Sequence, residues 1–252
     1  MSLAFRLIAR LDIRGAHLIK TIRLEGVRKL GDPADYAKRY DAQGIDEIIY
    51  NDAVASLYGR NGLGGLLQRT ADECFVPVTA AGGIRSVSDV RELLRVGADK
   101  IAVNTAAIKR PELITEIAEQ FGSQAMVIQI DAKRKNGGWE AYCDGGRQPT
   151  GKDAIEWAAE AVGRGAGEVL VTSIDREGTA SGCDSDLCRR ISNAVPVPTV
   201  AAGGICTARH VIDAAQAGAT GVAMAGALHY GKVSLAEMRG ALTEAGIPVR
   251  TL

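Results

Sequence analysis

The chain has 252 residues, 46% of them hydrophobic, and its 30 basic side chains balance its 30 acidic ones. This composition can bury the core of one α/β barrel, so length alone does not require two domains. A formal charge of zero argues against binding to the phosphate backbone of a nucleic acid.

Eight apolar segments rich in Val and Ile alternate with segments of helical spacing. The predicted strands are residues 6–12, 46–51, 76–81, 99–104, 125–131, 167–173, 197–202 and 220–226. The predicted helices between them are residues 33–43, 87–96, 111–121, 153–164 and 208–217. Continuously apolar strands are typical of parallel strands buried on both faces. The alternation predicts a (β/α)₈ TIM barrel, with a doubly wound open sheet as the alternative.

One stretch of the sequence occurs twice. The segment VPVTAAGGI at residues 76–84 returns as VPTVAAGGI at residues 197–205, 121 residues later. Residues 44–50 resemble residues 165–171 at the same offset. A period this long is not that of a solenoid repeat. We expect one domain, residues 1–252, made of two similar half-barrels at about 1–122 and 123–252, and this symmetry favours a closed barrel.

Cysteine usage and hydropathy suggest a cytoplasmic protein. The five cysteines are odd in number and form no C-x-x-C pair, which favours free thiols in a reducing compartment. The three histidines lack the spacing of metal ligands, so no metal and no cofactor is expected. Apolar runs stay below the roughly 18 residues of a membrane span. Arg6 and Arg10 interrupt the apolar start that a signal peptide needs.

Two aspartates end strands that lie opposite each other in an eight-stranded barrel. Asp12 ends the first predicted strand and Asp131 the fifth, so both carboxylates face the mouth, where barrels carry their chemistry. Such a pair can divide acid and base work if the surroundings separate the two pKa values. Either aspartate alone would more often cap a loop. Asp175 also lies near a strand end, but its glycine-bearing loop favours a structural role.

Two glycine pairs, Gly82-Gly83 and Gly203-Gly204, each follow a strand and precede a helix start. Backbone N–H groups there can approach an anion, although the glycines could also serve close packing alone. Two such sites on opposite sides predict a substrate phosphorylated at both ends. The residues predicted to bind substrate or phosphate are Lys20, Gly82, Gly83, Asn104, Thr105, Thr172, Glu177, Gly178, Gly203, Gly204, Ala225 and Gly226.

Several motifs together resemble the cyclase subunit of imidazole glycerol phosphate synthase, over nearly the whole chain. These motifs are Asp12, GDP at 31–33, AAGGIRS at 80–86, NTAA at 104–107, FGSQ at 121–124, IDAKR at 130–134, TG at 150–151, and GAGE at 165–168 continuing through GT at 178–179. The related isomerase of histidine biosynthesis shares the half-barrel repeat and the two aspartates. It is a poorer match at residues 131–134 and at the base of the barrel.

The resemblance implies a lyase that uses ammonia from a glutaminase subunit docked beneath the barrel. The two subunits would form a heterodimer, and neither a nucleic acid nor a membrane is expected as a partner. Ammonia crosses the interior and reacts with a bisphosphorylated ribulosyl aminoimidazole carboxamide. The products are imidazole glycerol phosphate and aminoimidazole carboxamide ribotide. Asp12 and Asp131 would be the acid–base pair, and Lys20 a substrate contact in a mobile loop. The charged gate at the base would be Arg6, Glu47, Lys100 and Glu168; ordinary surface ion pairs are the alternative, because buried charges are costly unless paired.

Three interior positions depart from the family pattern, which has small or apolar side chains there: Arg10, Asn51 and Gln129. Strand alternation places Arg10 inside the barrel, beneath Asp12. Because a buried guanidinium needs partners, we expect Arg10 to contact Asn51, Gln129 or Asp12 and to hold Asp12 ionised.

These departures leave two alternative functions open. One is a paralogue that channels ammonia for amination of a nucleotide-activated sugar in surface-polysaccharide biosynthesis. The other is a non-catalytic phosphate-binding barrel. The second glycine site departs from the family as well, since Ala202, Glu177 and Gly226 replace the usual Ser, Asp and Ser. This loss of hydroxyl donors bears on how tightly a second phosphate binds.

Overall fold

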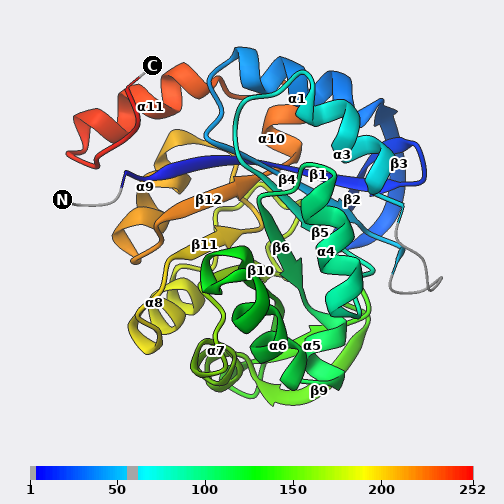
Figure 1. The fold of residues 1–252 in the computed structure, drawn as a ribbon. Coiled ribbons are helices and arrows are strands. Elements are labelled where there is room, and N and C mark those ends of the chain that lie inside the picture. Colours follow the sequence, from blue (N-terminus) through cyan, green and yellow to red (C-terminus); the bar gives the residue numbers. More distant parts are fainter. Residues whose placement is uncertain (1–3, 56–61, 252) are drawn as a thin grey trace.

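A computed structural model describes residues 4–55 and 62–251. Within these residues, eight parallel strands form a ring that the pairing of β7 with β10 closes (Figure 1). In ring order they are β1 (Arg6–Arg14), β4 (Glu47–Asp52), β5 (Val78–Ala81), β6 (Lys100–Val103), β7 (Met126–Lys135), β10 (Glu168–Ser173), β11 (Thr199–Ala202) and β12 (Gly221–Met224). The predicted closed barrel is confirmed, and the open sheet is excluded.

Helices surround the ring and lie between successive strands (Figure 1). The predicted helices correspond within one residue at each end to α1 (Pro33–Ala42), α4 (Val87–Arg95), α6 (Glu112–Phe121), α7 (Ala154–Gly163) and α9 (Ala208–Gln216). The sequence reading missed α3 (Gly64–Ala71), α5 (Thr105–Lys109), η1 (Ser123–Ala125), α8 (Ser185–Ala194), α10 (Gly226–His229) and α11 (Leu235–Glu244). None of the described helices is long and apolar enough to cross a membrane.

Side-chain caps explain where several of these helices begin. Ser86 forms a capping box with Asp89 at the start of α4, and Thr207 accepts a hydrogen bond from the backbone N–H of His210 at the start of α9. Such caps satisfy N–H groups that have no partner within the helix. Both helices therefore start directly behind the two glycine pairs, as the sequence predicts.

The internal repeat is also present in the secondary structure. Strands β4, β5 and β6 and helices α1 and α4 return as β10, β11, β12, α7 and α9 at the same offset of 121 residues. In the ring, the first half contributes β1, β4, β5 and β6, and the second contributes β7, β10, β11 and β12. This correspondence supports our proposal of one domain composed of two half-barrels.

Two antiparallel hairpins extend from the mouth, and the sequence reading missed them. They are β2 (His17–Ile22) with β3 (Glu25–Gly31), and β8 (Gly138–Cys143) with β9 (Gln148–Asp153). Strands β1 and β7 continue past the barrel to pair with β2 and β8. Asn136 and Gly137 both have positive φ at the turn between β7 and β8, as a tight hairpin turn requires.

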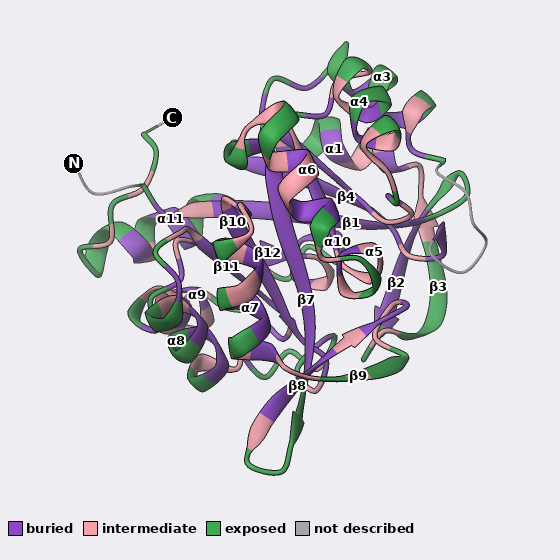
Figure 2. Ribbon diagram, turned by 60° about the horizontal axis from the view of Figure 1, so that its bottom comes forward, coloured by how far each residue is buried: buried purple, intermediate pink, exposed green. Residues whose placement is uncertain are grey.

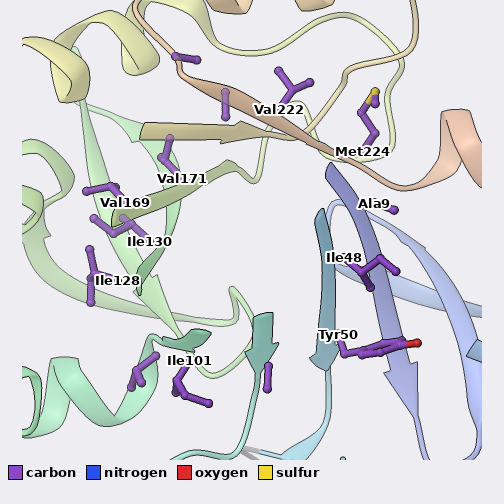
Figure 3. Packing of buried hydrophobic residues seen from close by; sticks show 14 of the residues in the cluster. Ala9, Ile48, Tyr50, Ile101, Ile128, Ile130, Val169, Val171, Val222 and Met224 are labelled. Carbon is purple, nitrogen blue, oxygen red and sulfur yellow. The ribbon is translucent and has the colours of Figure 1, made fainter. Parts of the chain in front are cut away.

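The buried hydrophobic residues form two clusters, one between the strands and the helices and one inside the ring. Figure 2 shows that the barrel strands are largely buried, and Figure 3 shows residues of the outer cluster, such as Ile48 and Val222. Leu7 and Ala9 of β1 belong to the outer cluster, whereas Ile8 belongs to the inner cluster. The inner cluster consists of Ile8, Ile49, Ala81, Ala102, Val127, Leu170, Val200, Ala202 and Ala223. Alternation along β1 therefore directs Arg6, Arg10 and Asp12 into the barrel together with Ile8.

Two glycines at different kinds of position provide a test of this fold. Gly240 is exposed within α11, where an added Cβ would meet nothing within 4 Å, so Gly240→Ala should stabilise the protein by about 1 kcal/mol through helix propensity. Gly165 has a φ of +115°, and an added Cβ would lie 2.7 Å from that of Ala118. Gly165→Ala should therefore destabilise the protein by about 1–3 kcal/mol. Thermal unfolding of both variants measures the two signs, and equal effects would contradict this description.

Candidate active site

Two cavities open at the carboxyl ends of the barrel strands. Their volumes are about 330 Å³ and about 790 Å³, which lie within the range of small-molecule sites. Arg10, Asp12 and Thr21 line both cavities, so the two are neighbours at the barrel axis. Asp131 and Gln129 face the smaller cavity, and Thr172 faces the larger. One mouth with two compartments suits an elongated substrate.

Asp12 and Asp131 project into the mouth from strands on opposite sides of the ring, as predicted. Both are buried, with exposed fractions of 4% and 2%. Asp12 Oδ1 accepts hydrogen bonds from Arg10 Nε at 3.0 Å and from Asn51 Nδ2 at 2.7 Å. Asp131 accepts hydrogen bonds from Asn104 Nδ2 at 3.0 Å and from Gln129 Nε2 at 3.4 Å. The two carboxyl groups are thus similarly buried but have different donors.

The pKa values of the two carboxyl groups are shifted in opposite directions. Burial by itself raises the pKa of Asp12, but the charge of Arg10 and the hydrogen bond from Asn51 outweigh it and lower that pKa below its ordinary 3.8. Burial raises the pKa of Asp131, and Arg10 and the amide donors offset this only in part. A depressed and an elevated carboxyl pKa at one mouth are what an acid–base pair requires.

Arg10 lies inside the barrel, 5% exposed, and the expectation that it contacts Asp12 is confirmed. Its NH1 group also donates to Thr172 Oγ1 at 2.9 Å. The other two atypical residues donate hydrogen bonds to the carboxylates and not to Arg10. Asn51 donates to Asp12, and Gln129 donates to Asp131. All three polar departures therefore belong to one network around the two aspartates.

The first glycine pair lines the smaller cavity together with Asn104 and Thr105. A Cβ at Gly82 would collide with the backbone of Asp52, so close packing also requires glycine at this position. The packing role and the anion-binding role are therefore compatible. Four basic residues that the sequence reading did not single out line the same cavity: Arg85, Lys109, Arg110 and Arg147. They lie in loops or at the end of a short helix, where side-chain direction follows no period.

The second glycine pair lines the larger cavity. The remaining residues predicted to bind substrate or phosphate line it too, namely Lys20, Thr172, Glu177, Gly178, Ala225 and Gly226. A Cβ at Gly204 would collide with the carbonyl of Gly182, so this pair is also needed for packing. Arg28 and Lys232 add positive charge at this cavity, and the sequence reading missed both.

Lys20 lies in the connection between β1 and α1, as predicted, but its side chain there is buried and not solvated. Lys20 belongs to β2, is 9% exposed and forms an ion pair with Glu177. Glu177 also accepts a hydrogen bond from the backbone N–H of Leu24 at 3.1 Å, and its carbonyl accepts one from Arg23. The first hairpin is therefore attached to the loop after β10, because Lys20 and the backbone of its turn both bind Glu177.

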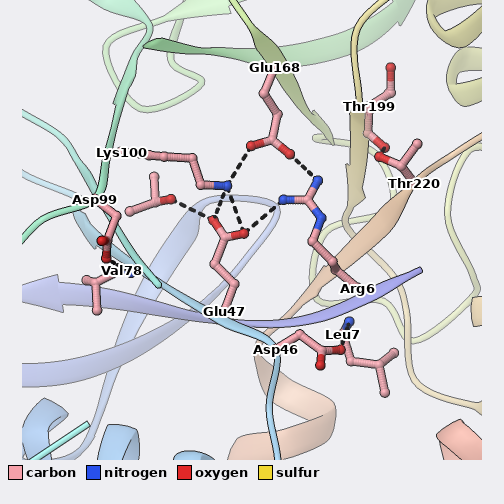
Figure 4. A network of polar contacts seen from close by, with 11 residues as sticks. Arg6, Leu7, Asp46, Glu47, Val78, Asp99, Lys100, Glu168, Thr199 and Thr220 are labelled. Carbon is pink, nitrogen blue, oxygen red and sulfur yellow. Dashed lines mark hydrogen bonds and ion pairs between the residues drawn. The ribbon is translucent and has the colours of Figure 1, made fainter. Parts of the chain in front are cut away.

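The four charges predicted at the base of the barrel form one connected network (Figure 4). Arg6 pairs with Glu47 at 2.9 Å and with Glu168, and Lys100 pairs with each glutamate at 2.8 Å. Thr79 donates a further hydrogen bond to Glu47 at 2.7 Å. Burial raises the pKa of Glu168, but Lys100 and Arg6 outweigh it and lower that pKa overall. The alternative of ordinary surface ion pairs does not hold, since both glutamates are buried.

The described residues contain no group of three or more His, Cys, Asp or Glu side chains that could hold a metal ion. The five cysteines are free.

A closed barrel with two cavities and a buried carboxylate pair at the carboxyl ends of its strands is typical of a (β/α)₈ enzyme. A family model described as histidine biosynthesis protein matches residues 6–234, and the chain belongs to this family. A Legionella pneumophila protein named imidazole glycerol phosphate synthase subunit HisF is 55% identical over 201 residues, covering 79% of this chain and 95% of that protein. A protein of the same name from Myxococcus xanthus is 46% identical over 248 residues, covering 98% of each chain.

The opposite pKa shifts predict opposite effects on stability when each aspartate is neutralised. Asp12, with its lowered pKa, stabilises the fold above the pKa of the unfolded chain, and this stabilisation is lost as pH falls through the folded pKa. Asp12→Asn should therefore cost about 3 kcal/mol or more at pH 7, because it leaves Arg10 buried without its hydrogen-bonded counter-charge. This cost should shrink as the solution is made more acidic than pH 4.

Asp131, with its raised pKa, contributes stability at low pH that is lost as pH rises through the folded pKa. The asparagine in Asp131→Asn cannot ionise. The free energy of unfolding of this variant, relative to that of the parent protein, should therefore increase as pH rises above 3.8, and at pH 8 the variant should be the more stable of the two. Urea unfolding of both variants between about pH 2 and pH 8 tests the pair. Parallel curves for the two variants would contradict the assigned shifts.

Proposed function

We propose that the chain is the cyclase subunit of an imidazole glycerol phosphate synthase, a lyase of histidine biosynthesis. Relatives with this name match it over almost its whole length. The observation that carries the proposal is the pair of buried aspartates between two anion cavities. The cavities would hold the two phosphates of a ribulosyl aminoimidazole carboxamide, and the aspartates would face the ketose between them.

The reaction needs a proton acceptor and a proton donor at the same carbonyl group. Ammonia adds to the ketose carbon, the ketose oxygen leaves as water, and acid–base steps then close the imidazole ring. The same steps expel aminoimidazole carboxamide ribotide and leave imidazole glycerol phosphate. Asp12 and Asp131, with pKa values shifted apart, can supply one ionised and one protonated carboxyl group.

Both cavities have basic residues that could meet a phosphate. Lys109, Arg110, Arg85 and Arg147 line the smaller one near the glycine pair, although Lys109 is paired with Asp144 and Arg110 with Glu116. At the larger cavity, Lys20 is already paired with Glu177. Backbone N–H groups at Gly203 and Gly204 remain suited to a second phosphate. We therefore assign both phosphates, with Lys20 as a substrate contact that exchanges Glu177 for phosphate on binding.

The barrel interior provides the route that we propose for ammonia. The charged gate lies at the amino-terminal ends of the strands, and the apolar inner cluster lies between it and Arg10. Ammonia is small and neutral, so an apolar passage favours it over ammonium ion. A glutaminase subunit would dock against the gate and supply it, and the free thiols suit a reducing cytoplasm for this assembly.

The alternatives of a sugar-aminating paralogue and a non-catalytic barrel are not favoured. The chain is 44–46% identical to relatives named as the synthase subunit over at least 98% of its own length. Both aspartates and both glycine-lined cavities, on which the proposed reaction depends, are also present. The polar interior residues surround the aspartates and do not replace them.

An ammonium-dependent assay tests the reaction without a partner. The purified chain, given the phosphoribulosyl substrate and excess ammonium salt, should turn the substrate over with loss of its absorbance. Asp12→Asn and Asp131→Asn should each lower kcat by at least about 100-fold, the usual range for loss of an acid or base. Asp175→Asn is the matched control, because Asp175 binds the backbone of Arg134 and should leave kcat unchanged. A folded chain without turnover would refute the proposal.

The partner can be tested with the glutaminase subunit that serves the Myxococcus xanthus synthase. Mixed with this chain, it should form a heterodimer in size-exclusion chromatography and support glutamine-dependent turnover. Lys100→Met removes one cation of the gate. This variant should alter glutamine-dependent turnover while its ammonium-dependent turnover stays within about twofold, because external ammonia enters at the mouth. Equal losses with both nitrogen sources would argue against passage through the gate.

A further inference from the structure

Two carboxyl groups at the same depth in one mouth differ in the charge of their donors. Among the described residues, the hydrogen-bond donors to Asp131 are the neutral amides of Asn104 and Gln129. Asp12 has one neutral donor, Asn51, and one cationic donor, Arg10. Charged donors form hydrogen bonds roughly twice as strong as neutral ones and favour the ionised acceptor. Arg10 is therefore the side chain that makes the surroundings of the two carboxyl groups unequal.

The guanidinium of Arg10 is held across the barrel interior. Its stem rises from β1, and its NH1 reaches Thr172 on β10, which lies three places away in the ring. Both Arg10 and Thr172 are buried, and Asn51 and Arg10 share the same oxygen of Asp12. Thr172 thus fixes one end of the planar group while Nε binds the carboxylate, which leaves the guanidinium little freedom to turn towards Asp131.

We propose that Arg10 is a positioning residue that divides the acid–base work, by keeping Asp12 as the base and leaving Asp131 as the acid. The inference rests on the proposed function, since it concerns the same reaction. Asp12 takes a proton from the ammonia-derived nitrogen and Asp131 gives one to the ketose oxygen, which yields a carbinolamine. A second round of the same two transfers, after the pair has been reset, gives the imine and releases the oxygen as water. The pair regains its starting state by exchanging protons with solvent at the mouth.

The other ionisable groups near Asp12 do not reproduce this effect. Lys20 of β2 acts on Asp12 through space, but its ammonium group is hydrogen-bonded to Glu177. His229 of α10 is buried against Tyr40, and burial lowers its pKa to about 4, so it is neutral during turnover at pH 7. Asp131 of β7 and Glu177 also face Arg10, and they are anions or neutral acids that supply no positive charge. Arg10 therefore remains the cation in direct contact with the base.

Titration of the two carboxyl groups tests the inference without any assay of activity. Aspartate side-chain carbons labelled with ¹³C report ionisation by NMR, and Asp12→Asn and Asp131→Asn assign the two signals. In Arg10→Met the pKa of Asp12 should rise by about 1–3 units, the usual effect of one adjacent arginine. Arg10→Lys should restore part of the lowering of the Asp12 pKa, since lysine keeps the positive charge but lacks the planar guanidinium with its several N–H donors. An unchanged Asp12 titration in Arg10→Met would overturn the inference.

Two further variants separate positioning from stability. Arg239→Met is the matched control, because Arg239 is also a buried arginine in an ion pair, with Asp46 at 2.6 Å. It should lower stability and leave the Asp12 signal unchanged. Thr172→Val keeps the charge of Arg10 and removes the acceptor that orients it. It should raise the pKa of Asp12 by less than Arg10→Met does, and it provides the test if Arg10→Met does not fold.

The pH profile of turnover links this titration to the reaction. With free ammonia held constant by adjusting the ammonium salt, the acidic limb of kcat/KM should move to higher pH in Arg10→Met, by the same amount as the NMR signal. A lower kcat with an unmoved limb would overturn the positioning role. A moved NMR signal together with no turnover in the parent protein would instead refute the proposed function, while the coupling of Arg10 to Asp12 would stand.

Discussion

Closure of the ring by the pairing of β7 with β10 is the constraint on which the rest of this structure depends. Once eight strands close, every second residue of each strand must share one narrow interior. The interior therefore becomes a column of layers, with the ion-pair network at the base, an apolar layer above it, Arg10 next, and the two aspartates at the mouth. Each proposed step of the reaction uses one level of this column.

The buried charges in the column are tolerable because each one has a partner. At the base, two cations and two anions alternate, so no charge there is left without compensation. At the mouth only one of the two carboxyl groups has a cationic partner. Arg10 binds Asp12, whereas Asp131 accepts hydrogen bonds from neutral amides. That imbalance leaves the pKa of Asp131 raised and the pKa of Asp12 lowered, and perturbed carboxyl groups of this kind are common at active sites.

The half-barrel repeat supplies matching positions, and the side chains there make the two halves unequal. Asp12 and Asp131 belong to equivalent strands, as do the two glycine pairs. The smaller cavity has Lys109 and several arginines in its lining, whereas the larger one has Arg28, Lys232 and a Lys20 that is paired with Glu177. A symmetric scaffold thus presents two different ends to a substrate whose own ends differ.

The sequence by itself determined the eight strands, five of the helices, the positions of the glycine pairs and the inward direction of Arg10. These follow from local periodicity and capping, which depend on neighbouring residues in the chain. Tertiary structure decided that Arg10 binds Asp12 and Thr172, that Lys20 binds Glu177, and that basic residues from separate loops line one cavity. The hairpins β2–β3 and β8–β9 were also missed, because they are half exposed and carry no continuous apolar run. Contacts between residues more than 150 positions apart, such as Arg10 with Thr172, depend on ring closure and leave no periodic signal in the sequence.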